Sequence, residues 1–287
     1  MPMQVVYSWT HPTDRAGARR IVAAMREAAL KLPFVRVSEI IDEEWGDEQT
    51  RDPERRKKRR KKMSDADLER HFIRWPGRWF VKNDDDHEVD GELIEPTWTC
   101  YFTAELNGCD PVIAALASHV SHVNVKREWG GYSEASTKLE GLMAWQCRVE
   151  TLNASMPQHG GWANFLKQHT TVLKFLGTVE KLGPTLDVWD QDGYWETTSE
   201  DLLRKDLERS GAITAHSFGA MKDAMEHGDE LGDVLPFLKH PLFEQLEAKG
   251  EQIANEDTPG KHWMREGEEQ MREEPWQEHH RRLREEE

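Results

Sequence analysis

The chain has 287 residues and a formal net charge of -16, with 37% hydrophobic and 32% charged residues. This length is enough for one large domain or two small ones with an apolar core. The acidic balance argues against a general attraction to nucleic acid or to an anionic membrane. No apolar run approaches the roughly 20 residues that span a bilayer. The three cysteines have no CxxC spacing, which fits reduced thiols in the cytoplasm, where we expect this protein.

The first residues predict a strand, a helix and a second strand. The run "QVVYSW" is rich in β-formers, and Thr13 or Asp14 can cap the helix that follows. Apolar residues recur in that helix at helical spacing, and "FVRVSEII" predicts the next strand. Residues 46–95 then form a charged insertion, with a short helix expected from Ser64 and a short strand in "GRWFVKN".

Regular patterns return at "PTWTCYFTAEL", where apolar and polar residues alternate as in a half-buried strand. The run "DPVIAALASHV" predicts a helix, with Asp110 as its cap and Pro111 at its first position. Another alternating strand is expected in "LMAWQCRVETL". Its buried face would consist of Met143, Trp145, Cys147 and Val149.

The clearest helical pattern begins near Gly161, where apolar residues and His169 form one stripe. Gly183 and Pro184 are placed to end this helix. The run "LDVWDQDGYWET" predicts a hairpin around Asp192 and Gly193. Two further helices are expected in "SEDLLRKDLERSG" and "HSFGAMKDAMEHG", and the sequence becomes polar beyond about Leu246.

Together these elements predict an α+β fold. We expect a mainly antiparallel sheet with helices packed on one face, following a split βαβ plan. A single domain would cover residues 1–246 and carry the charged insertion, with a C-terminal helical segment. Residues 247–287 would form a polar tail that is disordered or a frayed helix.

Two residues are candidates for catalysis. Ser217 lies in "AHSFG", which approximates the G-x-S-x-G turn of serine hydrolases. The strand that this turn requires would be the short "AIT", so we favour a helix start instead. His169 lies inside an apolar stripe, where a buried imidazole needs hydrogen-bond partners. We favour a satisfied core histidine over a base tuned by a neighbouring carboxylate.

Candidates for metal binding are His119 and His122, which lie three residues apart near the end of a predicted helix. A third ligand is missing, so we favour a role at the helix terminus. A calcium loop around Gly193 would require acidic ligands at Val188 and Ser199, and the match fails. We therefore expect no metal and no cofactor.

A candidate binding surface lies around the predicted hairpin. Three aromatic residues lie there beside three acidic ones, which suits a protein interface. The alternative is that the rings fasten the hairpin to the preceding helix, as most large aromatic residues belong to a core. The six residues are Trp189, Asp190, Asp192, Tyr194, Trp195 and Glu196.

The run "RRKKRRKK", Arg55–Lys62, raises the question of nucleic-acid binding. The acidic segment "NDDDHEVDGELIE" comes right after the wider basic span Arg51–Lys82 and would compete with phosphates for these cations. Blocks of like charge also tend to stay unfolded. We expect an exposed insert that binds nucleic acid weakly, without sequence preference and only at low salt.

These observations support three functions. The first is a soluble, non-catalytic interaction protein that binds a protein partner or associates with itself. The alternative is a hydrolase that uses Ser217, or His169 with a carboxylate. The third is a weak nucleic-acid binder through residues 55–62. We expect neither a specific nucleic-acid partner nor a membrane partner.

Overall fold

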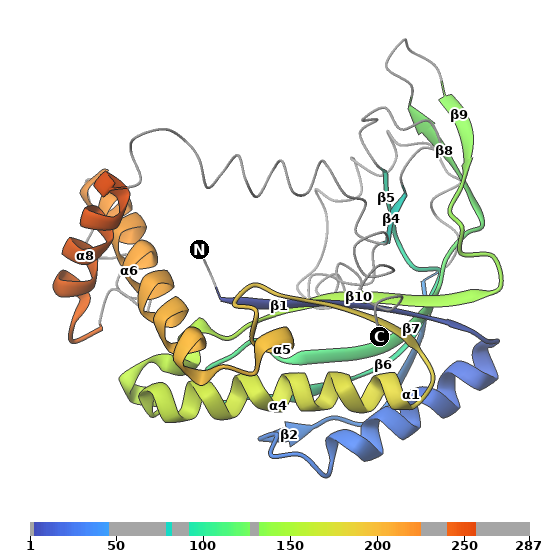
Figure 1. Ribbon diagram of the computed structural model, residues 1–287. Coiled ribbons are helices and arrows are strands. Elements are labelled where there is room, and N and C mark those ends of the chain that lie inside the picture. Colours follow the sequence, from blue (N-terminus) through green and yellow to red (C-terminus); the bar gives the residue numbers. More distant parts are fainter. Residues whose placement is uncertain (1–2, 46–78, 82–91, 127–131, 225–239, 257–287) are drawn as a thin grey trace. The chain divides into compact units, whose positions relative to one another are not determined.

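The computed structural model describes residues 3–45, 79–81, 92–126, 132–224 and 240–256 (Figure 1). The chain forms two compact units. We call Pro2–Asp206 the sheet unit and Leu207–Glu287 the helical unit. The basic run at 55–62, the helix expected from Ser64 and the tail beyond Glu256 lie outside the described residues.

The sheet unit contains a seven-stranded sheet and two short hairpins. The strands are β1 (Gln4–Pro12), β2 (Arg36–Val37), β3 (Ile41–Glu44), β4 (Trp79–Val81), β5 (Glu92–Ile94), β6 (Trp98–Glu105), β7 (Val112–Ser118), β8 (His122–Lys126), β9 (Tyr132–Ser136), β10 (Leu142–Glu150) and β11 (Thr185–Asp190). The helices are α1 (Arg15–Ala29), α4 (Gly161–Lys181), α5 (Tyr194–Thr197) and the start of α6 (Glu200–Ala224), with the 3-10 turns η1 (Leu152–Ser155) and η2 (Pro157–His159).

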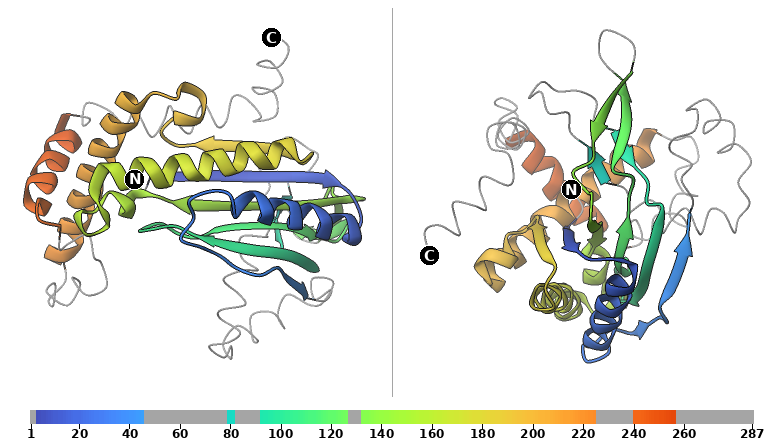
Figure 2. Two further views of the ribbon diagram at one scale, coloured as in Figure 1. Left: turned by 90° about the horizontal axis from the view of Figure 1, so that it is seen from below. Right: turned by 90° about the vertical axis from the view of Figure 1, so that its right-hand side faces the viewer.

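The main sheet is antiparallel, with the strand order β11-β1-β10-β7-β6-β2 and with β3 also paired to β6. Helices α1 and α4 lie side by side on one face of it (Figures 1 and 2). Strands β10 and β11 flank β1 and are joined through α4, which is a split βαβ arrangement. The α+β fold expected from the sequence is therefore confirmed.

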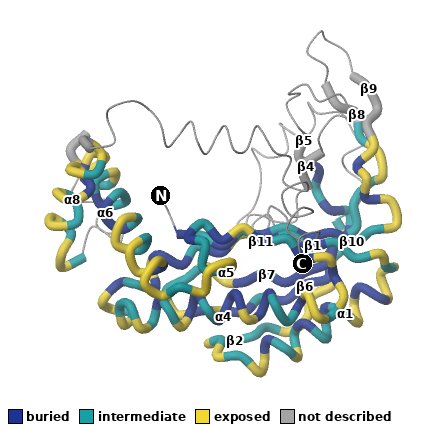
Figure 3. The backbone as a smooth tube through the Cα atoms, in the orientation of Figure 1, coloured by how far each residue is buried: buried dark blue, intermediate teal, exposed yellow. Residues whose placement is uncertain are grey.

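Alternation along β1 and β10 explains the core beneath the helices. Val5, Tyr7 and Trp9 of β1 are buried, and their cross-strand partners on β10 include Cys147 and Trp145. The intervening residues of β1 are only partly buried, as expected for a sheet with one less covered face. In Figure 3, long dark blue stretches follow β6 and β7, whereas the residues of β1 alternate between buried and partly buried.

The sheet has a gap between β10 and β7, where the two strands share a single bridge pair, Ala144 with Ala117. Three aromatic side chains donate hydrogen bonds to the main chain of β7 there. Trp9 Nε1 lies 2.7 Å from the Ala115 oxygen, and Trp145 Nε1 and Tyr7 Oη lie 2.9 and 3.0 Å from the Ile113 oxygen. These side chains donate to carbonyl groups that would otherwise pair with a neighbouring strand. We call this region, with Tyr7, Trp9 and Trp145, the aromatic gap.

The prediction of a helix beginning at Asp110 is wrong, because Val112–Ser118 form strand β7. This strand pairs with all of β6 from Trp98 to Ala104. Its residues are buried or half-buried on both faces, so their apolar run lacks the alternation of a half-exposed strand. A short apolar run of this kind cannot be assigned by periodicity alone. Strand β6 is likewise covered on both faces, and Trp45 Nε1 donates to Thr99 Oγ1 on one of them.

The prediction of a hairpin around Asp192 and Gly193 is also wrong. Strand β11 pairs with β1, and the chain beyond Gly193 forms the single helical turn α5. Gly193 has a φ of 63°, which favours glycine, so it supplies the turn between strand and helix. The Asp-Gly pair therefore marks a turn, as expected, but one that leads into a helix.

The helical unit contains most of α6 and the helix α8 (Phe243–Glu256). The two helices expected around Gly211 are one continuous helix, α6, because Gly211 is tolerated within it. Helices α6 and α8 run antiparallel, with Gly250 so close to the Ala212 oxygen that a Cβ there would lie 2.2 Å from it. Glu247, where the expected tail begins, lies within α8. Among the described helices, none is both long and apolar enough to cross a membrane.

Candidate functional site

A buried group of one histidine and two aspartates lies in the sheet unit, and we call it the His–Asp cluster. His169 belongs to α4, Asp190 ends strand β11, and Asp192 lies in the turn that follows. One potential ligand atom from each residue lies within 4.8 Å of the other two. Residues distant in the sequence thus meet where α4 crosses the end of β11.

Both ring nitrogens of His169 have neighbours. Nε2 lies 3.3 Å from Asp190 Oδ2, and Nδ1 lies 3.4 Å from Thr151 Oγ1. Thr151 follows β10, and its hydroxyl also lies 3.4 Å from the Met3 oxygen. Because a hydroxyl can donate to only one of these acceptors, the tautomer of His169 and the direction of the Thr151 hydrogen bond depend on each other.

The two carboxylates of the cluster are only partly satisfied. Asp190 Oδ2 accepts a hydrogen bond from the Trp195 main-chain nitrogen at 2.9 Å. Asp190 Oδ1 and Asp192 Oδ2 are buried without a hydrogen-bond partner among the described residues. Burial, with Asp190 and Asp206 nearby, raises the pKa of Asp192 to about 8.

Aromatic rings surround the imidazole. Phe165 stacks on His169 with ring centroids 5.5 Å apart, and Tyr194 meets it edge-on at 5.8 Å. Trp162 contacts Phe165, and the Arg204 guanidinium lies 4.7 Å above the Trp162 ring. This apolar surrounding lowers the local dielectric, so each unpaired charge in the cluster is costly.

The chemistry open to the cluster follows from its burial. A histidine with an adjacent carboxylate can act as a general base, but the side chains of His169 and Asp190 have 0% exposure. A substrate in contact with solvent would not reach them without movement. One imidazole nitrogen and carboxylate oxygens are, however, common ligands of divalent metal ions.

The six residues of the expected binding surface separate into two groups. Trp189 and Glu196 are exposed, whereas Asp190 and Asp192 are buried in the cluster. Tyr194 and Trp195 are partly buried against the main core. The segment therefore places its acidic side chains partly in the interior and one indole at the surface.

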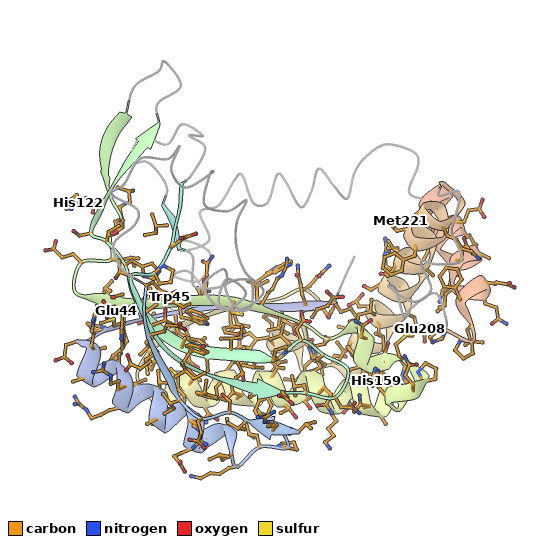
Figure 4. All side chains as sticks on the ribbon, turned by 180° about the vertical axis from the view of Figure 1, so that it is seen from behind. Glu44, Trp45, His122, His159, Glu208 and Met221 are labelled. Carbon is orange, nitrogen blue, oxygen red and sulfur yellow. The ribbon has the colours of Figure 1, made fainter. Side chains whose placement is uncertain are left out.

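The remaining candidates lie elsewhere. Ser217 lies within α6 and donates from Oγ to the Ile213 oxygen at 3.0 Å, so it belongs to the helical unit and not to a strand-to-helix turn. His119 follows β7 and His122 begins β8, so their spacing does not place them on one helix face. Figure 4 shows His122 and His159 at opposite ends of the sheet unit, and neither belongs to the cluster.

One signal in the sequence could have indicated the cluster. Leu186, Val188 and Asp190 alternate along the strand, so Asp190 points to the same buried face as the two apolar residues. A carboxylate on that face needs a partner, and His169 was the expected buried polar residue of the packed helix.

Comparisons with protein-family models, with curated proteins and with solved structures found no match to this chain. The geometry of the sheet unit is therefore the basis for its functional interpretation.

Proposed function

We propose that the protein is a non-catalytic interaction protein that binds a cationic protein partner along strand β11. The observation that carries this proposal is the 42% exposure of Trp189, which lies on the edge strand of the sheet. Tryptophan is strongly enriched among the residues that dominate binding energy at interfaces, because its burial removes a large apolar area from water.

Trp189 is one end of a row across three strands. It pairs with Val6 of β1, which in turn pairs with Arg148 of β10. Val6 is half-buried and Arg148 is exposed, and both lie on the sheet face opposite α1 and α4. An aromatic ring, an aliphatic side chain and a guanidinium in one row offer apolar contact area next to a polar group, a combination that protein interfaces use.

The edge position adds main-chain hydrogen bonds to this surface. Among the described strands, β11 pairs on one side only, with β1. The other side of an edge strand presents N–H and C=O groups that can pair with an added strand. An extended segment of a partner could therefore bind here through its main chain and anchor on Trp189.

Charge favours a cationic partner over a second copy of the chain. Residues 185–201 contain no basic residue, and four of their six acidic residues lie outside the buried cluster, namely Asp187, Glu196, Glu200 and Asp201. Opposite charge steers association and like charge suppresses it, so a second copy with a net charge of -16 is disfavoured. The same repulsion disfavours nucleic acid at this surface.

The cytoplasm is the compartment that we propose for this function, because Cys100, Cys109 and Cys147 are free thiols. The hydrolase alternative has less support. Ser217 is part of a helix, and the His169–Asp190 pair is fully buried. Ser217 Oγ is exposed but donates within its own helix and is not held on a strand-to-helix turn, and the buried His169 is out of reach of a substrate in solvent.

The experiment is an affinity pull-down from the source cell with the full chain, followed by mass spectrometry and a binding titration with the recovered protein. We expect a partner with a basic segment, bound more tightly at low salt. Trp189→Ala should weaken binding by more than about 2 kcal/mol, the usual threshold for a dominant interface residue.

Leu202→Ala is the matched control, because Leu202 is also an exposed apolar residue, 45% exposed, on helix α6. It should leave the affinity unchanged. Equal binding by the Trp189→Ala variant, or a wild-type chain that captures no partner at low salt, would overturn the proposal.

A further inference from the structure

The His–Asp cluster contains more unpaired oxygen than its protein neighbours satisfy. Asp190 Oδ1 and Asp192 Oδ2 are buried without a partner among the described residues. The two residues are only 4% and 8% exposed, respectively. Leaving a buried polar group unpaired is costly, and burying a charge costs far more. Native structures rarely keep such atoms without a reason.

We propose that the His–Asp cluster is a binding site for a divalent transition-metal cation. His169 would supply one nitrogen ligand, and Asp190 and Asp192 would supply one carboxylate oxygen each. The three ligand atoms lie within 4.8 Å of one another. Metal–ligand bonds of about 2.0–2.2 Å place neighbouring ligands about 3–4 Å apart, so only a small contraction is needed.

The two oxygens of Asp190 have separate roles in this arrangement. Oδ2 accepts the Trp195 main-chain N–H at 2.9 Å, which fixes the orientation of the carboxylate. The Trp195 nitrogen belongs to α5, so the helical turn after Gly193 is part of what holds this ligand. In the part of the chain that the structure describes, Oδ1 has no donor, and we assign it to the cation.

Thr151 is placed to set the tautomer of His169. A cation at Nε2 requires the proton on Nδ1, which then donates to Thr151 Oγ1 at 3.4 Å. The Thr151 hydroxyl can in turn donate to the Met3 oxygen at 3.4 Å. Histidine ligands usually donate their second ring N–H to such a partner, which orients the ring. Thr151 is therefore a positioning residue and not a ligand.

The donor set selects the class of cation. Calcium takes six to eight oxygen ligands and magnesium keeps mostly oxygen and water, so neither suits a site with an imidazole. Imidazole suits zinc and iron, and carboxylate suits manganese, so a mixed set favours this group of metals.

A cation here would connect two elements that are distant in the sequence. His169 and Asp190 are separated by 21 positions, on α4 and β11. Because the side chains of both residues are fully buried, the cation would stabilise the junction of helix, strand and turn. The site departs from the sequence expectation that no metal is held, and it does not depend on a partner at β11.

The experiment uses the full chain, purified without a histidine tag. Elemental analysis should find a stoichiometric transition metal. After chelation, titration with Zn²⁺ and with Mn²⁺ should show saturable binding, and the preferred ion should raise the melting temperature in a concentration-dependent way. Absence of saturable binding by both ions would overturn the proposal.

Three variants assign the site. Asp192→Asn should weaken binding of the preferred ion by more than about 100-fold, since losing a ligand costs more than losing the partner of a ligand. Thr151→Val should weaken it by about 10–100-fold. The control is Asp110→Asn, an exposed aspartate outside the cluster, which should bind as the wild type does. Unchanged affinity in Asp192→Asn would place the metal elsewhere and sink the assignment.

Asp192→Asn is also the variant with the best prospect of folding. Asp192 Oδ2 is buried and has no partner among the described residues, so replacing that oxygen breaks no hydrogen bond there. Asparagine has nearly the same shape and no charge. A folded variant, checked by circular dichroism, then separates loss of the metal from loss of the fold.

Discussion

The aromatic gap and the His–Asp cluster both bury polar groups in the sheet unit, but they differ in how fully hydrogen bonds satisfy those groups. In the gap, the N–H or O–H groups of Trp9, Trp145 and Tyr7 reach carbonyls of β7 at 2.7–3.0 Å. In the cluster, the side-chain distances around His169 are 3.3 and 3.4 Å, and two carboxylate oxygens have no partner among the described residues.

The difference separates buried polar groups that the protein itself satisfies from the carboxylates for which we propose a cation. Neutral donors and carbonyl acceptors in the gap need nothing more, because each hydrogen bond offsets the desolvation of both groups. Carboxylates at the cluster repel one another when both are ionised, and protein donors are too few to compensate. We expect the gap to govern stability, and the cluster to govern how stability responds to pH and to cations.

The largest effect on stability should come from truncating a tryptophan of the aromatic gap. Trp9→Ala removes a buried indole and leaves the Ala115 carbonyl without its donor, so it should lower the free energy of unfolding by about 3–5 kcal/mol. Urea unfolding measures this loss. Trp189→Ala, at an exposed position, should change it by less than about 0.5 kcal/mol. Similar losses in both would mean that Trp9 does not fill the gap.

The next prediction concerns pH in the chelated, metal-free protein. The pKa of Asp192 is about 8 in the fold and near its ordinary 3.8 when unfolded, so between these values the folded state binds the extra proton. Stability is then highest below the unfolded pKa and falls by about 1.4 kcal/mol per pH unit as the pH rises toward the folded pKa.

Comparison with Asp192→Asn isolates this term. The variant lacks the titrating group, so the stability difference between the two proteins should grow by about 4 kcal/mol between about pH 5 and about pH 8, in favour of the variant. Denaturant unfolding at a series of pH values measures it. Parallel curves would show that Asp192 keeps an ordinary pKa and that the cluster is better satisfied than its contacts indicate.

A third carboxylate in the cluster should be costly. His169→Asp would place a further acid beside Asp190 and Asp192 and remove the imidazole, the one basic member of the cluster within the described ranges. It should therefore destabilise the metal-free protein by about 2–4 kcal/mol at neutral pH. The same change at exposed His122 should cost less than about 0.5 kcal/mol. Thermal unfolding compares the two, and an unchanged melting temperature for His169→Asp would contradict the burial of the cluster.

Sequence patterns were sufficient for the elements with one clear period. The alternation in β10 placed Met143, Trp145, Cys147 and Val149 on the buried face, and the stripe around His169 placed α4. Strand β7 was mistaken for a helix because tertiary packing covers both of its faces, which removes the alternation that identifies a strand.

The cluster required information that local patterns do not contain. Its residues come from α4, β11 and the following turn, and they meet because β11 pairs with β1 and not with the chain after Gly193. The predicted hairpin would have exposed Asp190 and Asp192 together with the rings. Pairing at long range therefore decided which acidic residues became buried, and the sequence alone left that pairing open.

The smallest effect should come from Thr151, which lies between the cluster and the main chain of Met3. Thr151→Val keeps the shape and removes the hydroxyl, whose two neighbours are both 3.4 Å away. Hydrogen bonds at this distance are weak, and the Thr151 main-chain N–H still donates to the Met3 oxygen at 2.9 Å. The metal-free variant should therefore lose less than about 1 kcal/mol of stability, as urea unfolding can measure.

Thr185→Val, at an exposed position of β11, is the control for the β-branched replacement. A loss above about 2 kcal/mol would exceed what one net hydrogen bond contributes. The cluster would then be held by its own contacts as firmly as the aromatic gap, and the contrast between the two regions would fail.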